Sequence, residues 1–146
     1  MSAAYLLDTN ILLYAISSAD DHAARKAVAR QWMARSDWGV STQVPLELYH
    51  NASKPRHGLG AARAAQLVDA VAARYPVQST DAALVTETMH LARHSQISLW
   101  DAAILCAARR LGAHTVVSED LNHGQVYDDV RVLNPFAQRQ LAGPAA

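Results

Sequence analysis

The sequence has a single cysteine, no long apolar run and no basic residue near its start, and each of these absences argues against a class of protein. Cys106 is the single cysteine among 146 residues, so the chain has neither a disulfide framework nor a cysteine-based zinc site. The longest unbroken apolar run covers residues 102–108, far short of the roughly 18 residues that a membrane-spanning helix needs. The first Lys or Arg is Arg25, so the basic start of a signal peptide is missing. We therefore expect a cytoplasmic protein with no membrane contact.

An excess of one charge is also absent, because 13 Lys and Arg balance 13 Asp and Glu. This balance excludes a generally basic nucleic-acid coat and an acidic tail, and RNA could be bound only through a local basic patch. Hydrophobic residues make up 51% of the chain, and 29 of its residues are alanine, which favours helices around a buried core. The length suits one domain spanning residues 1–146, with a core at about 3–135 and a frayed tail at 141–146.

Short apolar segments alternate with amphipathic ones along the chain. We predict strands at 5–7, 38–42, 77–79, 115–117 and 131–133. The predicted helices are 11–16, 22–35, one that carries Pro45 in its first turn and ends near 53, 61–74, 81–94 and 98–111, and a loop spans 54–58. This alternation predicts an α/β domain with a mostly parallel sheet and helices on both faces. In such a sheet the functional site lies beyond the carboxyl ends of the strands.

Two acidic residues follow predicted strands directly. Asp8 lies between apolar segments, where a carboxylate must be hydrogen-bonded, paired or bound to a metal, although it could simply form a turn. Asp120 follows Ser118 and Glu119 after the strand at 115–117, and its ordinary role would be in a loop. Both acids are expected at the edge of the sheet where a ligand binds.

Two more acids lie on helix faces that should point inward. Glu47 shares a face with Val44 and Leu48, although it could also snorkel to solvent or pair with an arginine. Asp101 shares a face with three apolar residues, and with Ser98 it also has the form of a capping box. If all four acids converge, their charges repel one another and raise their pKa values unless a hard cation such as Mg²⁺ or Mn²⁺ binds them.

Two other chemistry-bearing features are weaker. His90 and His94 have the spacing of zinc ligands on a helix, but the residues between them lack the glutamate of a zinc protease, so a solvated helix end is the better interpretation. Cys106 lies in the middle of a buried helix, which favours a packing role over that of a nucleophile.

The four acids lie in motifs that resemble those of the PIN domain, and within it the VapC-type toxins of bacterial toxin–antitoxin pairs. The resemblance covers essentially residues 3–135. The motifs occur in the expected order, namely Leu6-Leu7-Asp8-Thr9-Asn10, Ser41 through Glu47-Leu48, Ser98-Leu99-Trp100-Asp101-Ala102 and Val117-Ser118-Glu119-Asp120-Leu121.

The resemblance implies a PIN-like three-layer sandwich and a Mg²⁺-dependent endoribonuclease, with Mn²⁺ as an alternative ion. It assigns the catalytic positions to Asp8, Glu47, Asp101 and Asp120, with Asp8 and Asp101 as the main metal ligands and Glu47 and Asp120 as secondary ones. Asn10 and Ser118 would be polar supports. The family's fourth motif is commonly Thr-x-Asp and is Ser118-Glu119-Asp120 here, so either Glu119 or Asp120 could be the fourth acid.

The resemblance also implies a homodimer and a small antitoxin that inserts into a groove leading to the site. The substrate would be RNA, and a site of four acids needs nearby cations to hold the phosphate backbone. The candidates for this RNA contact are Lys54 and Arg56 in the loop 54–58, together with Arg109 and Arg110.

Two alternatives to a ribonuclease remain open at the level of sequence. The segment Leu7-Asp8-Thr9-Asn10 is similar to the Asp-x-Asp motif of haloacid-dehalogenase-like phosphatases, with Asp8 as nucleophile. The second Asp of that motif is Asn10 here, and neither lysine lies downstream where that family needs one. The other alternative is a non-catalytic domain that binds a metal and a partner.

Overall fold

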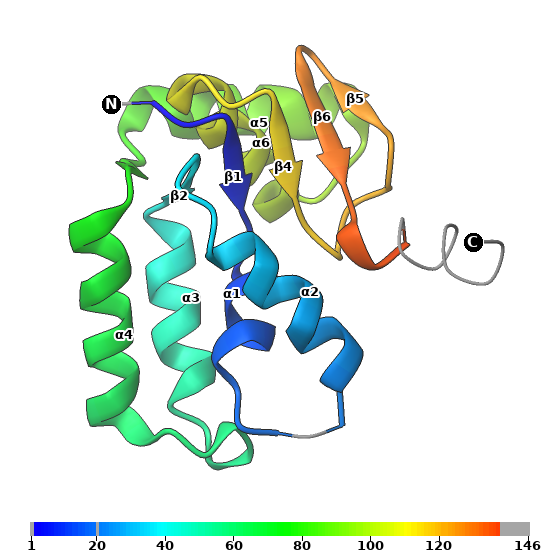
Figure 1. Ribbon diagram of the computed structural model, residues 1–146. Coiled ribbons are helices and arrows are strands. Elements are labelled where there is room, and N and C mark those ends of the chain that lie inside the picture. The colour runs from blue at the N-terminus through cyan, green and yellow to red at the C-terminus, as the bar shows by residue number, and fades with distance from the viewer. Residues whose placement is uncertain (1, 20, 138–146) are drawn as a thin grey trace, which may run out of the picture.

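Six strands form one sheet at the centre of the molecule (Figure 1). A computed structural model describes residues 2–19 and 21–137, so the tail at 141–146, predicted to be frayed, lies outside the described residues. The strands are β1 (Tyr5–Leu7), β2 (Trp38–Ser41), β3 (Val77–Gln78), β4 (Thr115–Val117), β5 (Val126–Tyr127) and β6 (Val130–Leu133). Their order is β3-β2-β1-β4-β6-β5, and every pair is parallel except β5 and β6.

Helices flank the sheet, as the alternating pattern predicts. They are α1 (Thr9–Ile16), α2 (Ala23–Met33), α3 (Gln43–Ala52), α4 (Gly60–Arg74), α5 (Ala82–Ser95) and α6 (Leu99–Leu111). The helices α5 and α6 lie behind the strands in Figure 1, and α6 packs against five of the six strands. The helix α1 packs on α2, and α3 lies alongside α4. Within the described part of the chain, no helix is both long enough and apolar enough to cross a membrane.

The core is built from the apolar residues of the strands and the inward faces of the helices. Leu6, Leu7 and Val116 have no exposed surface. Close packing of α6 on β2 is possible because residue 39 is glycine, since a Cβ at that position would lie 2.8 Å from Leu111 Cδ2. Burial of this kind stabilises the sheet at roughly 25 cal/mol for each Å² of apolar surface removed from water.

Three details differ from the predicted elements. The loop 54–58 contains a single turn of 3-10 helix, η1 (Pro55–His57). The strand β5 was not predicted, because its two residues carry no periodic pattern and pair with β6 through a tight hairpin. Val85, which the periodicity of residues 81–94 places inward, is 45% exposed.

The carboxyl edge of the sheet carries the polar residues that follow the strands. The chain runs from β1 to β2 and β3 on one side, whereas β4 and β6 lie on the other side of β1. The order in which the chain adds strands therefore reverses between β1 and β4, which makes this point the topological switch point of the sheet. The residues that follow these two strands are Asp8 and Ser118. Ligand sites of open parallel sheets form at such a position.

Candidate active site

Asp8 is a buried carboxylate held in place by two hydrogen bonds. Its residue is 8% exposed, and it forms the N-cap of α1. Its Oδ1 accepts a hydrogen bond of 2.8 Å from the backbone N–H of Thr9. Its Oδ2 accepts one of 2.7 Å from the Ser118 hydroxyl, which comes from the end of β4. Asp8 thus connects the ends of β1 and β4 at the switch point. The same residue caps α1 and lies where a ligand is expected.

Asn10 and Ser118 connect Asp8 to Asp120. The Asn10 side-chain amide donates to Asp120 Oδ2 at 3.1 Å, and it lies 3.4 Å from the Ser118 hydroxyl oxygen. The backbone N–H of Asp120 donates to the same hydroxyl oxygen at 3.1 Å. Asp8, Asn10, Ser118 and Asp120 therefore form one hydrogen-bonded group, which we call the acidic cluster.

Glu119 points away from the acidic cluster and pairs with α1 and α2. Its Oε1 accepts a hydrogen bond of 2.7 Å from the Tyr14 hydroxyl, and its Oε2 lies 2.7 Å from Arg25 Nε. The Arg25 guanidinium also lies over the rings of Tyr14 and Phe136. Of the two acids that the sequence left open, Asp120 is the one in the acidic cluster, whereas both oxygens of Glu119 are occupied elsewhere.

Glu47 lies within electrostatic range of Asp8, and the structure does not join Asp101 to the cluster. Glu47 is half-buried on α3 and accepts a hydrogen bond from the Gln43 side chain. Asp101 is half-buried in the first turn of α6, where its backbone N–H donates to the Ser98 hydroxyl at 3.0 Å, which is one of the two bonds of the expected capping box. Its carboxylate has no hydrogen bond or ion pair with another described residue.

The pKa of Asp8 is raised from 3.8 to about 6, and burial is the largest cause. The hydrogen bonds from Ser118 and Thr9 lower this pKa, whereas the negative charges of Asp120 and Glu47 raise it. The buried carboxylate is therefore held in an environment that disfavours its negative charge. A bound cation would reverse that preference. A cation bound at Asp8 would offset both the free-energy cost of burying its negative charge and the repulsion from its acidic neighbours.

The donor atoms of the site fit a hard divalent ion. The carboxylates of Asp8, Asp120 and Glu47 supply oxygen ligands, as Mg²⁺ and Mn²⁺ prefer, and Ser118 and Asn10 hold the first two in place. Among the described residues no three His, Cys, Asp or Glu side chains are arranged as a finished metal site. Neither the Asp101 nor the Glu47 carboxylate is hydrogen-bonded to a member of the acidic cluster.

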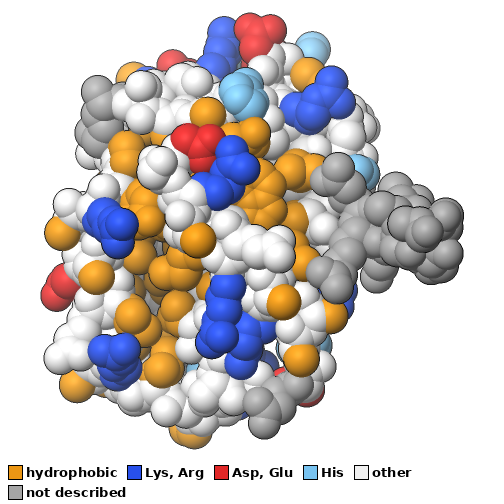
Figure 2. Space-filling model, viewed as in Figure 1, with side chains coloured by type: hydrophobic (Ala, Val, Ile, Leu, Met, Phe, Trp, Pro, Cys, Tyr) orange, Lys and Arg blue, Asp and Glu red, His pale blue; other side chains and the backbone are white. Residues whose placement is uncertain are grey.

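The four basic residues predicted to contact RNA have different surroundings. Arg109 lies 3.5 Å from Asp128, and Arg110 pairs with Asp81 and Glu87. Lys54 donates to the Asn51 side chain at 3.1 Å. Arg56 forms no ion pair with any described acid, and its Nε donates to His57 Nε2 at 3.2 Å. On the face shown in Figure 2, Lys and Arg side chains are scattered over several elements and form no single patch.

Sequence reasoning missed Tyr14 and Arg25 as partners of the site. Tyr14 lies one helical turn after Asn10, so the shared face of α1 was the available signal. Arg25 gave no such signal, because its partner Glu119 is 94 residues away and the two meet only in the folded chain.

Comparisons with known proteins place this geometry in a family. A family model described as the PIN domain matches residues 5–129. VapC20 from Mycobacterium tuberculosis, described as a toxin that cleaves the sarcin–ricin loop, is a similar solved structure with a TM-score of 0.62. It is 21% identical, and the match covers 80% of this chain and 91% of that chain.

Two toxin–antitoxin structures are similar as well. A DNA-bound VapBC from Salmonella typhimurium has a TM-score of 0.61 and 23% identity, covering 90% of this chain and 97% of that chain. A toxin–antitoxin complex from Klebsiella pneumoniae has a TM-score of 0.64 and 18% identity, covering 92% of this chain and 98% of that chain. No curated protein sequence matches this chain. At such identities the structural likeness shows the fold, and the family model, which covers most of the chain, shows that this protein belongs to the PIN-domain family.

Proposed function

We propose that this protein is a Mg²⁺-dependent endoribonuclease, with Mn²⁺ as an alternative ion, and that it is the cytoplasmic toxin of a VapBC-type pair. The observation that carries the proposal is the buried Asp8 at the switch point of a PIN-domain sheet, with Asp120 and Glu47 in electrostatic range. The solved toxins and toxin–antitoxin complexes of the same fold support this choice of reaction and partner.

The ligand roles of the four acids follow the PIN-domain motifs, and the roles of Ser118 and Asn10 follow from their contacts. A divalent ion, when bound, would supply a Lewis acid for the scissile phosphate and lower the pKa of a bound water. Asp8 and Asp101 would be its main ligands, with Glu47 and Asp120 as secondary ones. Ser118 orients the Asp8 carboxylate, and Asn10 orients that of Asp120. Asp120 is exposed and has one oxygen free of protein partners in the described part of the chain, so it can orient a water or accept its proton.

Cleavage of RNA by matched variants tests the proposal. We expect Asp8→Asn and Asp101→Asn to abolish Mg²⁺-dependent cleavage, because each removes an anionic ligand while nearly preserving side-chain shape. Asp69→Asn is the matched control, since Asp69 is exposed on α4 and has no partner among the described residues. Wild-type rates in the Asp101→Asn variant, with folding intact by circular dichroism, would show that Asp101 is no ligand.

The phosphatase alternative is disfavoured by the surroundings of Asp8. That family needs a lysine near its nucleophile, and no lysine is among the charged groups that act on the Asp8 carboxylate. The two lysines are bonded to the Ala19 carbonyl and the Asn51 side chain, away from Asp8. Rapid turnover of a chromogenic phosphomonoester would favour the phosphatase. Metal binding without cleavage of any RNA would favour a non-catalytic partner-binding domain.

The proposal includes a homodimer and a small antitoxin. Leu46 is 73% exposed on α3 and Trp100 is 66% exposed on α6, so both side chains are available to contact a partner. Light scattering on the purified protein tests the homodimer. Co-purification of a small protein encoded next to this chain tests the antitoxin.

A further inference from the structure

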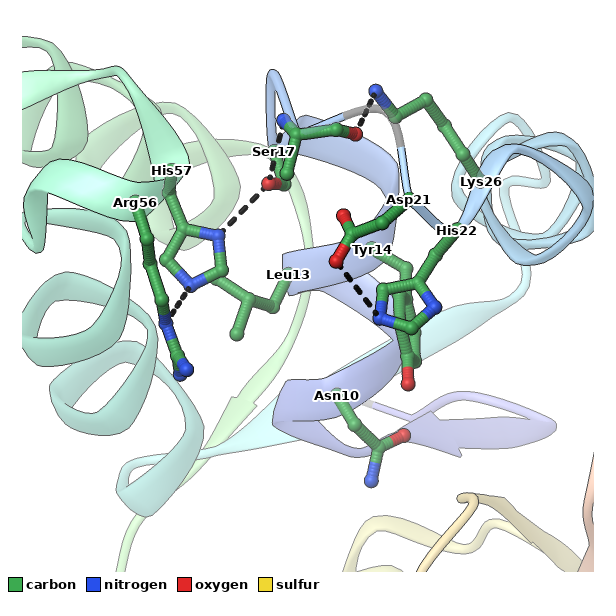
Figure 3. A pocket seen from close by; sticks show the side chains of 10 residues that line it. Asn10, Leu13, Tyr14, Ser17, Asp21, His22, Lys26, Arg56 and His57 are labelled. Atoms are coloured by element: carbon green, nitrogen blue, oxygen red, sulfur yellow. Dashed lines mark hydrogen bonds and ion pairs between the residues drawn. The ribbon is translucent and has the colours of Figure 1, made fainter.

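A pocket with a cavity volume of about 280 Å³ lies beside the acidic cluster, and Asn10 is the one cluster residue that lines it (Figure 3). Three segments line it, namely α1, the start of α2 with the residues before it, and η1. Asn10 lines the pocket at one end and also donates to Asp120. The pocket and the acidic cluster therefore share this one side chain. Its volume lies close to the lower end of the usual range for small-molecule sites, roughly 300–1,000 Å³.

Arg56 and His57 form one wall, which is fixed by hydrogen bonds to Ser17 and Ser18 just after α1. Arg56 Nε donates to His57 Nε2 at 3.2 Å, so Nε2 is an acceptor and the ring proton of the neutral imidazole is on Nδ1. That N–H donates to the Ser17 hydroxyl at 2.8 Å, and both residues are buried. The His57 carbonyl accepts from the backbone N–H and the hydroxyl of Ser18. The Arg56 side chain is thus presented to the pocket from a braced turn.

The opposite wall is formed by the start of α2 (Figure 3). Lys26 Nζ donates to the Ala19 carbonyl at 3.1 Å, and the His22 ring lies 3.7 Å from Asp21. Leu13 and the Tyr14 ring contribute apolar surface between the two walls. The Tyr14 ring packs edge-on against His22, with centroids 5.4 Å apart, and its hydroxyl is occupied by Glu119.

The lining has the chemistry that recognises a nucleotide. Two permanent cations, two imidazoles and one carboxylate surround an apolar and aromatic surface. Lys26 and Arg56 lie on opposite walls of the pocket. Each cation can therefore contact one of the two phosphates that flank a nucleotide within a strand. Cations hold phosphates, and an aromatic face accepts any base by stacking. An acidic peptide would use the same cations, so its binding is the outcome that competes with a nucleotide.

We propose that this pocket binds the nucleotide next to the scissile phosphate of a single-stranded RNA, with Arg56 and Lys26 on its flanking phosphates and its base against Tyr14 and Leu13. This inference rests on the proposed ribonuclease function, because it assigns the pocket to the same substrate. It narrows the predicted RNA contacts to Arg56 and adds Lys26, which the sequence did not single out. Asn10 lines the pocket and donates to Asp120, so it lies between the proposed nucleotide and the reacting phosphate.

A binding experiment that needs no cleavage tests the pocket first. The probe is a nucleoside 3′,5′-bisphosphate, with inorganic phosphate as comparison, titrated into the metal-free protein and followed by the NMR signals of the histidine rings. We expect the bisphosphate to shift the signals of His22 and His57 and to leave those of His90 and His94 unchanged. Arg56→Gln/Lys26→Gln should weaken its affinity by roughly tenfold or more, since two charge-assisted contacts are lost. Arg63→Gln, on the exposed surface of α4, is the matched control.

Cleavage kinetics then separate the pocket from the proposed function. In the Arg56→Gln/Lys26→Gln variant we expect KM for RNA to rise roughly tenfold with a smaller change in kcat, because the lost contacts bind substrate and transition state alike. An unchanged KM, no shift of His22 and His57, or tighter binding of an acidic peptide than of the bisphosphate would overturn the pocket. Bisphosphate binding at His22 and His57 without RNA cleavage by the wild-type protein would overturn the ribonuclease function and leave the pocket standing.

Discussion

At the scale of single residues, Asp8 couples the site to stability. Its carboxylate is buried at the switch point, and its pKa of about 6 lies above its ordinary value of 3.8. Because the folded state binds the proton more tightly than the unfolded state, this group lowers the stability of the metal-free protein as the pH rises from about 4 through 6. The full effect, about 3 kcal/mol for a shift of this size, is present only above pH 6.

This coupling predicts a pH-dependent gain from Asp8→Asn. The amide mimics the protonated carboxyl, so at pH 7 with EDTA the free energy of unfolding of the variant should exceed that of the wild type by up to about 3 kcal/mol. The variant should accordingly unfold at a higher urea concentration. The difference should shrink towards zero at pH 4. Urea titrations at four pH values measure it, and a difference that is constant with pH would show that the Asp8 charge is not destabilising.

Glu119 is expected to act as a positioning residue for Asp120. Glu119→Gln keeps an acceptor for the Tyr14 hydroxyl but removes the charge that pairs with Arg25, so the segment 118–120 should loosen. The pair is about one-third exposed, so the loss of stability should stay near 1 kcal/mol or below. Cleavage should fall roughly tenfold, a loss of about 1.4 kcal/mol in transition-state stabilisation, through kcat at unchanged KM. An increase in KM alone would instead place Glu119 in substrate binding.

At the scale of elements, η1 depends on the glycine that follows it. Gly58 has a φ of +71°, and a Cβ at this position would collide with the Ser18 hydroxyl oxygen, which bonds the same turn to α1. We expect Gly58→Ala to destabilise the fold by about 1 kcal/mol or more and to weaken bisphosphate binding by displacing Arg56. Gly124→Ala is the control, because Gly124 also has a positive φ but an added Cβ there would meet no other atom within 4 Å. Equal losses of nucleotide affinity in the two variants would argue against a specific role for η1.

The elements also show where periodicity is informative. The helices and buried strands were predicted within one or two residues of their bounds, because each buries a stripe of apolar side chains that the sequence displays. η1 and β5 were not predicted, since they are stabilised by contacts with α1 and β6 rather than by any pattern of their own.

At the scale of the whole molecule, a bound ion should relieve the repulsion within the site. We expect Mg²⁺ or Mn²⁺ to raise the melting temperature of the wild type, with a gain of roughly 2.7 kcal/mol at a hundredfold excess over Kd. The Asp8→Asn/Asp101→Asn variant should lose most of this gain and melt higher than the wild type without metal. Differential scanning calorimetry measures both effects. Equal metal-induced shifts in the two proteins would place the ion elsewhere.

The sequence by itself determined the α/β class, the parallel sheet and the placement of Asp8 and Asp120 after strands, because hydrophobic periodicity and strand ends are local properties. Only the tertiary structure decided which acid beside Ser118 joins Asp8, since Glu119 is drawn away by Tyr14 and Arg25 from α1 and α2. It also separated Arg56, which lines a pocket, from Arg110, which two acids neutralise. Charge partners and cavities depend on residues far apart in the chain, and these meet only once the helices pack on the sheet.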